Sequence, residues 1–204
     1  MSDLFDQPEG ATPLSEEDQE GLIPSWIALR ADLNTAERDN ILAAVTWARD
    51  RRWKIEDFTQ ATLKRIHHQM FADVWRWAGT YRTAETNIGV PFHQISPEVE
   101  SLLRDIRAQV ADHTWEPDEI AVRFHHRLAW IHPFRNGNGR HARMVADLIA
   151  GALSRPPFSW GEGADLDSEG GARQVYIRAL QNADKGNVAP LLTFARNPRA
   201  AAPP

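Results

Sequence analysis

The chain has 204 residues, 42% of them apolar and 25% charged, which is enough to bury one hydrophobic core. A formal net charge of -5 argues against a broad basic surface for nucleic acid, and the lack of cysteine excludes disulfides and thiol nucleophiles. The N-terminal sequence has no signal-peptide pattern, and the longest apolar stretch falls short of the roughly 20 residues that span a bilayer, so we expect a cytoplasmic protein without membrane contact.

Helical patterns follow one another along most of the chain. A capping-box pattern at Asn34 and Glu37 opens the first predicted helix, whose apolar residues recur every three or four positions. Later starts are marked by proline near the first helical position, and stops by glycine or a following proline. Five further helices are predicted, from Ser96 to Val110, from Pro117 to Ile131, at residues 139–153 and 172–184, and from Pro190. The architecture is therefore expected to be all-α in its main part.

Three stretches lack helical periodicity. Residues 81–93 contain Asn87 and Gly89 and predict a β-hairpin or an extended loop. Residues 155–171 are rich in proline, glycine and acidic residues and predict a surface loop. At the two ends we expect a polar segment over 1–33, a candidate regulatory element, and a disordered tail over 197–204. One domain over 34–196 lies between them.

Residues 132–143, HPFRNGNGRHAR, combine the side chains and glycines that can bind a polyanion. Gly137 and Gly139 allow successive N–H groups to point inward at the N-terminus of the next helix, where phosphates bind readily. Arg140 and Arg143 share one helix face and can each pair with a phosphate. His132 beside such a nest can take a proton from an attacking hydroxyl. A surface turn between two helices is the alternative that composition and spacing leave open.

Two adjacent pairs of histidines, at residues 67–68 and 125–126, also invite a metal interpretation. Neighbouring residues on a helix point about 100° apart, so neither pair can chelate one ion from a single face. We expect these histidines to pack in the core or to form hydrogen bonds at the surface.

The 132–143 segment resembles the signature of the Fic/Doc family, H-x-F-x-[D/E]-G-N-G-R-x-x-R, at every fixed position except one. FADVWRWAGTYR at residues 71–82 resembles the family's approach to its flap, and residues 176–194 resemble its closing helices. The N-terminal sequence and Asn136 are more narrowly similar to the Fic-type proteins called mobile mystery protein B. The resemblance implies an all-α Fic-type helical bundle with a small β-hairpin flap.

The family's activity, carried over to these residues, is transfer of AMP from ATP to a Ser, Thr or Tyr hydroxyl of a target protein, with Mg²⁺. His132 would be the general base, and Phe134 would anchor the loop. The nucleotide-binding residues would be Gly137, Asn138, Gly139, Arg140 and Arg143. The target would be positioned by strand addition to a flap formed by Thr83, Ala84, Glu85, Thr86, Asn87, Ile88, Gly89 and Val90.

Asn136 is the departure from the signature, because the family has Asp or Glu there as the protein carboxylate on Mg²⁺. Magnesium sites of this kind use one or two carboxylates with substrate phosphates, so a neutral amide predicts weaker metal binding. Two alternatives therefore stay open. One is a catalytically weak Fic-fold module that binds nucleotide in regulation or interaction, and the other is a transferase of a different phosphate-containing group.

Many members of the family are inhibited by a glutamate in the pattern [S/T]-x-x-x-E-[G/N], which pairs with the second arginine of the signature. The chain has no clean copy of it. TAERDN at residues 35–40 places Asp39 where the glutamate should be, and Glu20 is followed by a glycine but lacks the Ser or Thr. Glu20 and Asp39 are thus candidate inhibitory partners of Arg143. The alternative is a separate antitoxin-like or regulatory protein, as expected of a toxin-like enzyme.

Overall fold

The structure is a computed structural model that describes residues 20–161, 166 and 170–196. Its described helices are α2 (Arg30–Arg49), α3 (Gln60–Phe71), α4 (Ile95–Ala111), α5 (Pro117–Ile131), α6 (Asn138–Ala152), α7 (Gly171–Asp184) and α8 (Ala189–Arg196), with single 3-10 turns η1 (Ile55–Asp57) and η2 (Phe92–Gln94). The predicted mainly α-helical architecture is confirmed. Over the described ranges, no helix is both long enough and apolar enough to cross a membrane.

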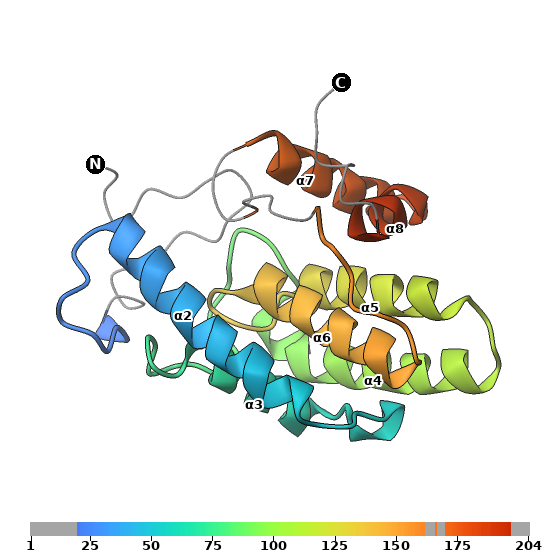
Figure 1. The fold of residues 1–204 in the computed structure, drawn as a ribbon, viewed down its shortest axis with the longest axis horizontal. Coiled ribbons are helices and arrows are strands. Elements are labelled where there is room, and N and C mark those ends of the chain that lie inside the picture. The colour runs from blue at the N-terminus through green and yellow to red at the C-terminus, as the bar shows by residue number, and fades with distance from the viewer. Residues whose placement is uncertain (1–19, 162–165, 167–169, 197–204) are drawn as a thin grey trace.

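The helices pack around α5 and α6, which lie against each other at the centre of the bundle (Figure 1). Helix α4 packs on α5, α2 packs on α3, and α7 pairs with α8, which returns to α5. Along α5 the predicted apolar stripe of Ile120, Phe124, Leu128 and Ile131 is buried. The termini of α5 and α6 are joined by residues 132–137, so the bundle brings the polar motif to one end of its two central helices.

Two local expectations about helices change in the structure. Helix α2 begins at Arg30, not at Asn34, because the carboxylate of Asp32 accepts the N–H of Leu29 over 3.0 Å and so caps an earlier turn. Helix α3 was missed by the sequence analysis, although Thr59 caps it by accepting the N–H of Thr62 over 3.2 Å. Both helices then bury one face in the core, which on α2 includes the polar side chains of Glu37 and Asn40.

The predicted β-hairpin flap is wrong, because the described residues contain two isolated bridges and no strand. One bridge joins Tyr81 to Phe134 at the entrance of the segment. Beyond it, the main chain of residues 83–90 bends without a cross-strand ladder. The carbonyl oxygens at its ends accept from the Arg82 side chain instead, as described below. The segment is a side-chain-supported loop.

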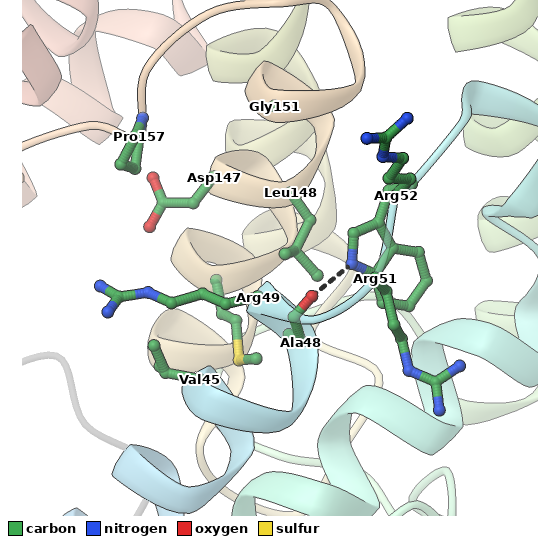
Figure 2. A pocket seen from close by; sticks show the side chains of 11 residues that line it. Val45, Ala48, Arg49, Arg51, Arg52, Asp147, Leu148, Gly151 and Pro157 are labelled. Carbon is green, nitrogen blue, oxygen red and sulfur yellow. Dashed lines mark hydrogen bonds between the residues drawn. The ribbon is translucent and has the colours of Figure 1, made fainter.

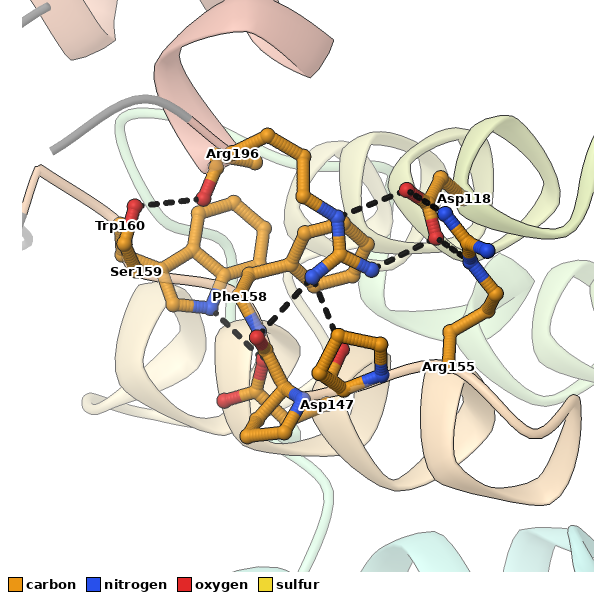
Figure 3. A network of polar contacts seen from close by, with 10 residues as sticks. Asp118, Asp147, Arg155, Phe158, Ser159, Trp160 and Arg196 are labelled. Atoms are coloured by element: carbon orange, nitrogen blue, oxygen red, sulfur yellow. Dashed lines mark hydrogen bonds and ion pairs between the residues drawn. The ribbon is translucent and has the colours of Figure 1, made fainter.

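The C-terminal halves of α2 and α6 leave a cavity of about 480 Å³ between them (Figure 2). Residues 155–160, which the sequence assigned to a surface loop, cover the neighbouring part of α6. Asp118 pairs with Arg155 of this stretch over 2.9 Å and with Arg196 of α8 over 2.6 Å (Figure 3). Arg196 in turn donates to the carbonyl oxygens of Pro156 and Pro157. Phe158 is consequently buried. The predicted loop continues into residues 162–165 and 167–169, which lie outside the described residues.

Candidate functional site

The motif at residues 132–143 forms a tight turn and the first turns of α6. His132 ends α5 in a left-handed conformation with φ 56° and ψ 59°, and Gly137 caps α6 with φ 76°. For a residue with a side chain such a conformation costs about 1–3 kcal/mol and persists only where its surroundings fix it. The turn therefore holds the histidine close to a helix N-terminus.

The side chain of Asn138 closes this turn from inside. Its Oδ1 accepts the N–H of Phe134 over 2.9 Å, and its Nδ2 donates to the carbonyl oxygen of Phe134 over 2.8 Å. Phe134 is fully buried, which confirms its predicted anchoring position. Because the Asn138 side chain is used in this way, a phosphate at the turn would meet main-chain N–H groups of the first turn of α6, which have no acceptor within the helix.

His67 connects the turn to the chain before the flap. Its Nδ1 accepts the N–H of Gly79 over 3.0 Å, so its proton lies on Nε2, which donates to the carbonyl oxygen of Asn136 over 3.1 Å. The ring stacks on Phe134, with centroids 3.7 Å apart, and burial lowers the pKa of His67 well below 6.5. The expected packing role is thus seen for His67. Across the described part of the chain, no group of three or more His, Cys, Asp or Glu side chains could hold a metal.

His132 is buried, and burial lowers its pKa to about 4, with a further lowering by the charge of Arg82. Its Nδ1 lies 3.2 Å from the carbonyl oxygen of Ala129. A carbonyl oxygen can only accept, so Nδ1 carries the ring proton and Nε2 is the basic nitrogen. At neutral pH the imidazole is therefore uncharged, and its unprotonated nitrogen is Nε2.

Arg82 lies beneath the flap and is 3% exposed. Its Nε donates to the carbonyl oxygen of His132 over 2.8 Å, Nη1 donates to that of Ala84 over 3.0 Å, and Nη2 donates to that of Val90. Its own N–H donates to the carbonyl oxygen of Pro133 over 3.0 Å. One guanidinium thus ties both ends of the flap to the main chain of the histidine.

The end of the flap lies against His132, although the flap residues form no hairpin. Gly89 has φ 104°, and a Cβ atom added there would come within 2.6 Å of the Cβ of His132. Val90 is buried and donates its N–H to the carbonyl oxygen of Ile131 over 3.3 Å. Thr83, Ala84, Glu85, Asn87 and Ile88 are exposed, and Thr86 is half-buried. The exposed edge of this loop is available to a partner chain.

The two arginines of the motif occupy successive turns of α6. Arg140 pairs with Glu37 of α2, with Nη1 and Oε2 2.7 Å apart, and Glu37 also accepts from Nε1 of Trp75 over 2.7 Å. Arg143 lies over the ring of Tyr176, 5.5 Å from its centroid. A buried carboxylate that contacts a motif arginine was not foreseen in the sequence, where Glu37 was interpreted as a capping residue.

The two predicted inhibitory residues lie elsewhere on the surface. Asp39 is exposed on α2. Glu20 is also exposed, and its carbonyl oxygen accepts from Arg76 over 3.0 Å. Glu37 is a carboxylate that does reach an arginine of the motif, Arg140.

Asn136 does not present a magnesium site in the structure. Its Oδ1 accepts the N–H of Gly137 over 2.6 Å, so the amide oxygen is turned back on the turn itself. The described residues also contain no cluster of carboxylates around it. Asn136 alone therefore does not fit a divalent cation, and a nucleotide would have to supply the other ligands.

The helical bundle carries His132, the flap, Arg140 and Arg143 at one end, and comparison with known proteins matches part of the chain to a family. A model described as the Fic/DOC family matches residues 57–150. The described site residues from Tyr81 to Arg143 all fall within this range. Residues 57–150, a little under half of the chain, thus match the Fic/DOC family.

Related sequences and structures agree with this assignment. The protein adenylyltransferase fic-1 of Caenorhabditis elegans is 34% identical over 121 residues, which cover 57% of this chain and 22% of that protein. The protein adenylyltransferase Fic of Nematostella vectensis is 28% identical over 148 residues, 69% of this chain and 32% of that protein. The chain therefore spans about a fifth to a third of the length of these relatives.

Solved structures show the same fold. Fic-1 of C. elegans superposes with a TM-score of 0.65 and 21% identity, over 90% of this chain and 53% of that chain. BepC of Bartonella tribocorum, with bound AMPPNP, superposes with a TM-score of 0.59 and 22% identity, over 88% of this chain and 96% of that chain. A Fic domain of Bartonella quintana with bound ADP gives a TM-score of 0.59 and 23% identity, over 84% and 86% of the two chains.

Proposed function

We propose that the protein is an adenylyltransferase that moves AMP from ATP to a Ser, Thr or Tyr hydroxyl of a target protein. The observation that carries the proposal is the position of His132, which ends α5 beside Gly89 of the flap and the N-terminus of α6, with its Nδ1 on the carbonyl oxygen of Ala129. The names of the related adenylyltransferases and the adenine nucleotides bound in similar structures support it.

In the proposed reaction the target hydroxyl oxygen attacks the α-phosphorus of ATP. The bond from the α-phosphorus to the bridging oxygen breaks, and pyrophosphate leaves. Nε2 of His132 takes the hydroxyl proton as the new P–O bond forms. The flap, fixed by Arg82, would hold the target segment so that its hydroxyl reaches this nitrogen.

The nucleotide would be held by the start of α6. Main-chain N–H groups at Gly137, Asn138 and Gly139 and the charges of Arg140 and Arg143 favour a triphosphate there. The N–H of Gly137 donates to Asn136, and Arg140 to Glu37, so nucleotide binding exchanges these contacts for phosphate contacts. Mg²⁺, if used, would depend on the phosphates for its charge, because Asn136 supplies none.

The test is transfer of label from α-labelled ATP to the protein itself and to proteins of a cell lysate. His132→Ala should abolish transfer and leave ATP affinity unchanged within about threefold, because the phosphate contacts lie elsewhere. His126→Ala is the matched control, since His126 lies on the same helix and pairs with Asp184 at the surface. A parallel loss of ATP affinity in His132→Ala would contradict the role as base.

Binding of nucleotide without turnover is the second candidate. It is favoured by the neutral side chain at Asn136 and by the pairing of Arg140 with Glu37. ATP binding with no label transfer under any metal condition would select this candidate. Transfer of another phosphate-containing group would instead give a labelled product whose added mass differs from that of AMP.

The remaining expectations are part of the same proposal. We place the enzymatic domain at residues 34–196 in the cytoplasm, with an antitoxin-like or regulatory protein as a partner. The narrower relationship to mobile mystery protein B stays a prediction. The N-terminal segment as a regulatory element and the tail at 197–204 lie wholly or largely outside the described residues.

A further inference from the structure

The cavity between α2 and α6 is separate from the site of the motif. It lies toward the C-terminal ends of both helices (Figure 2). Its lining on α6 runs from Met144, which follows the last residue of the motif, to Gly151, thirteen residues or about 20 Å along the helix from Asn138 at a rise of 1.5 Å per residue. The cavity is lined by Val45, Ala48, Arg49, Arg51, Arg52, Trp53, Met144, Asp147, Leu148, Gly151 and Pro157.

The wall between the helices is apolar. Ala48 and Met144 are buried, Val45 and Leu148 are half-buried, and the indole of Trp53 is fixed by donating to the carbonyl oxygen of Ala48 over 3.0 Å. A volume of about 480 Å³ is within the range of small-molecule sites, which are mostly apolar with a few placed polar groups. The cavity can therefore take an apolar body of modest size.

Three arginines stand at its rim, all of them exposed: Arg49, Arg51 and Arg52. None of them forms an ion pair with any of the described residues. Arg51 is positioned by stacking 4.5 Å from the centroid of the Trp47 ring. Cations without carboxylate partners are notable on a chain of net charge -5, and they favour an anion at this rim.

A second, smaller cavity of about 280 Å³ adjoins the first and shares Arg51, Arg52 and Trp53 with it. It adds a further cation, Arg65, whose guanidinium lies 5.4 Å from the Trp47 ring. Its carboxylate, Asp57, already accepts the main-chain N–H of Lys54 over 2.8 Å. Asp57 offsets one of the three arginine charges of this cavity, so the lining where the two cavities meet remains positive.

Asp147 gives the larger cavity a second polar end. In Figure 2 it lies across Leu148 from Arg51 and Arg52. Its Oδ1 accepts from the N–H of Phe158 over 2.9 Å and from Nε1 of Trp160 over 3.0 Å, whereas its Oδ2 has no hydrogen bond within the described part of the chain. Oδ2 of Asp147 is thus an acceptor at the end of the cavity opposite Arg51 and Arg52.

We infer that this cavity binds a small organic anion with an apolar body. The body lies on the wall formed by α2 and α6, and its carboxylate or phosphate reaches Arg51 and Arg52. A ligand with a hydrogen-bond donor at its far end can use Oδ2 of Asp147. The inference is independent of the proposed transfer activity, because none of the residues used belongs to the motif.

The test is isothermal titration calorimetry of the full chain with 4-phenylbutyrate and with 4-phenylbutan-1-ol, which has the same apolar body without the charge. We expect the acid to bind at least about tenfold more tightly than the alcohol, from the charge-assisted contacts. Arg51→Gln with Arg52→Gln should remove that difference. Arg104→Gln should leave the difference intact, because Arg104 is an exposed arginine of α4, outside the cavity lining, that donates to Ser101 over 3.1 Å.

A second variant tests the cavity itself. A Cβ atom added at Gly151 meets nothing within 4 Å, so Gly151→Leu can fill the space without a clash, and leucine is the better helix former. Binding of the acid should be lost in this variant while its thermal stability is unchanged or higher. No detectable binding of the acid, equal binding of acid and alcohol, or unchanged binding in Gly151→Leu would each overturn the inference.

Discussion

Nε of Arg82 lies 2.8 Å from the carbonyl oxygen of His132, fifty residues along the chain. The same guanidinium reaches the carbonyl oxygens of Ala84 and Val90. His132 has a left-handed conformation, and its main chain is held on both sides, by Arg82 and by its own N–H bond to Leu128. Arg82 is thus a positioning residue for the proposed base and for the flap together.

Arg82→Lys should lower the rate of label transfer by about 10- to 100-fold at saturating ATP. A lysine has no planar fork and cannot reach three carbonyl oxygens in different directions, so one or two charged hydrogen bonds of about 1.5–3 kcal/mol each are lost. ATP affinity should stay within about threefold, as measured by calorimetry. Arg104→Lys serves as the control, and a purely structural role would appear as an equal loss of affinity and rate.

Gly89→Ala should reduce transfer at least tenfold through crowding of the base. Its φ of 104° is strained for alanine, and the added Cβ would lie 2.6 Å from the Cβ of His132. Gly186→Ala is the matched control, because its φ of 88° is also left-handed but a Cβ there meets nothing within 4 Å. If both variants lose transfer equally, backbone strain and not the contact with His132 is responsible.

The sequence was most informative where local signals marked both ends of an element. Pro117 and Pro133 bracket α5, and its predicted range agrees with the structure. Helix α4 begins at Ile95, one residue before the predicted start at Ser96, whose hydroxyl bonds to Gln60 in the structure. The hairpin prediction was wrong because turn residues do not indicate how the loop is held. In the structure the Arg82 side chain bonds the main chain where cross-strand hydrogen bonds were expected.

The site shows the same division between local and distant partners. The turn after His132 was predicted because it is contiguous and contains Gly137, and in the structure Asn138 closes it on Phe134, four positions away. Glu37 bonds to residues 38 and 103 positions away, and His67 to a carbonyl 69 positions away. Pairings over such separations have no periodicity, so a single sequence cannot indicate them.

Asp147→Asn should stabilise the fold above pH 6. Burial raises the pKa of Asp147 to about 6, despite the hydrogen bonds from Phe158 and Trp160 that favour its charged form. The folded protein therefore binds this proton more tightly than the unfolded chain, so its stability falls as pH rises from about 4 to 6. An asparagine keeps the hydrogen-bond acceptor without the charge. It should raise the free energy of unfolding by about 1–3 kcal/mol at pH 7.5 and leave it unchanged near pH 4. Denaturant unfolding at both pH values measures this, and a pH-independent difference would contradict it.

Asn136→Asp should strengthen ATP binding about three- to tenfold in the presence of Mg²⁺ and not in the presence of EDTA. The aspartate restores a charged oxygen ligand next to the phosphates. Asn187→Asp adds the same charge at the exposed start of α8, where Asn187 accepts the N–H of Ala189, and should have no effect. An equal change with and without the metal would show that position 136 does not face the cation.

Glu37→Gln should tighten ATP binding about three- to tenfold and raise label transfer with it. The Glu37 side chain is 2% exposed and lies 2.7 Å from Arg140, so in the structure it holds a cation that the proposed reaction needs for phosphate. Glutamine keeps an acceptor for Nε1 of Trp75 but removes the charge that competes with the nucleotide. Asp39→Asn, two positions along the same helix but exposed, and Glu20→Gln are the controls, and both should leave ATP affinity unchanged. Tighter ATP binding in either control would instead support Asp39 or Glu20 as the inhibitory carboxylate. Unchanged ATP affinity in Glu37→Gln would show that Glu37 only connects α2 to α6.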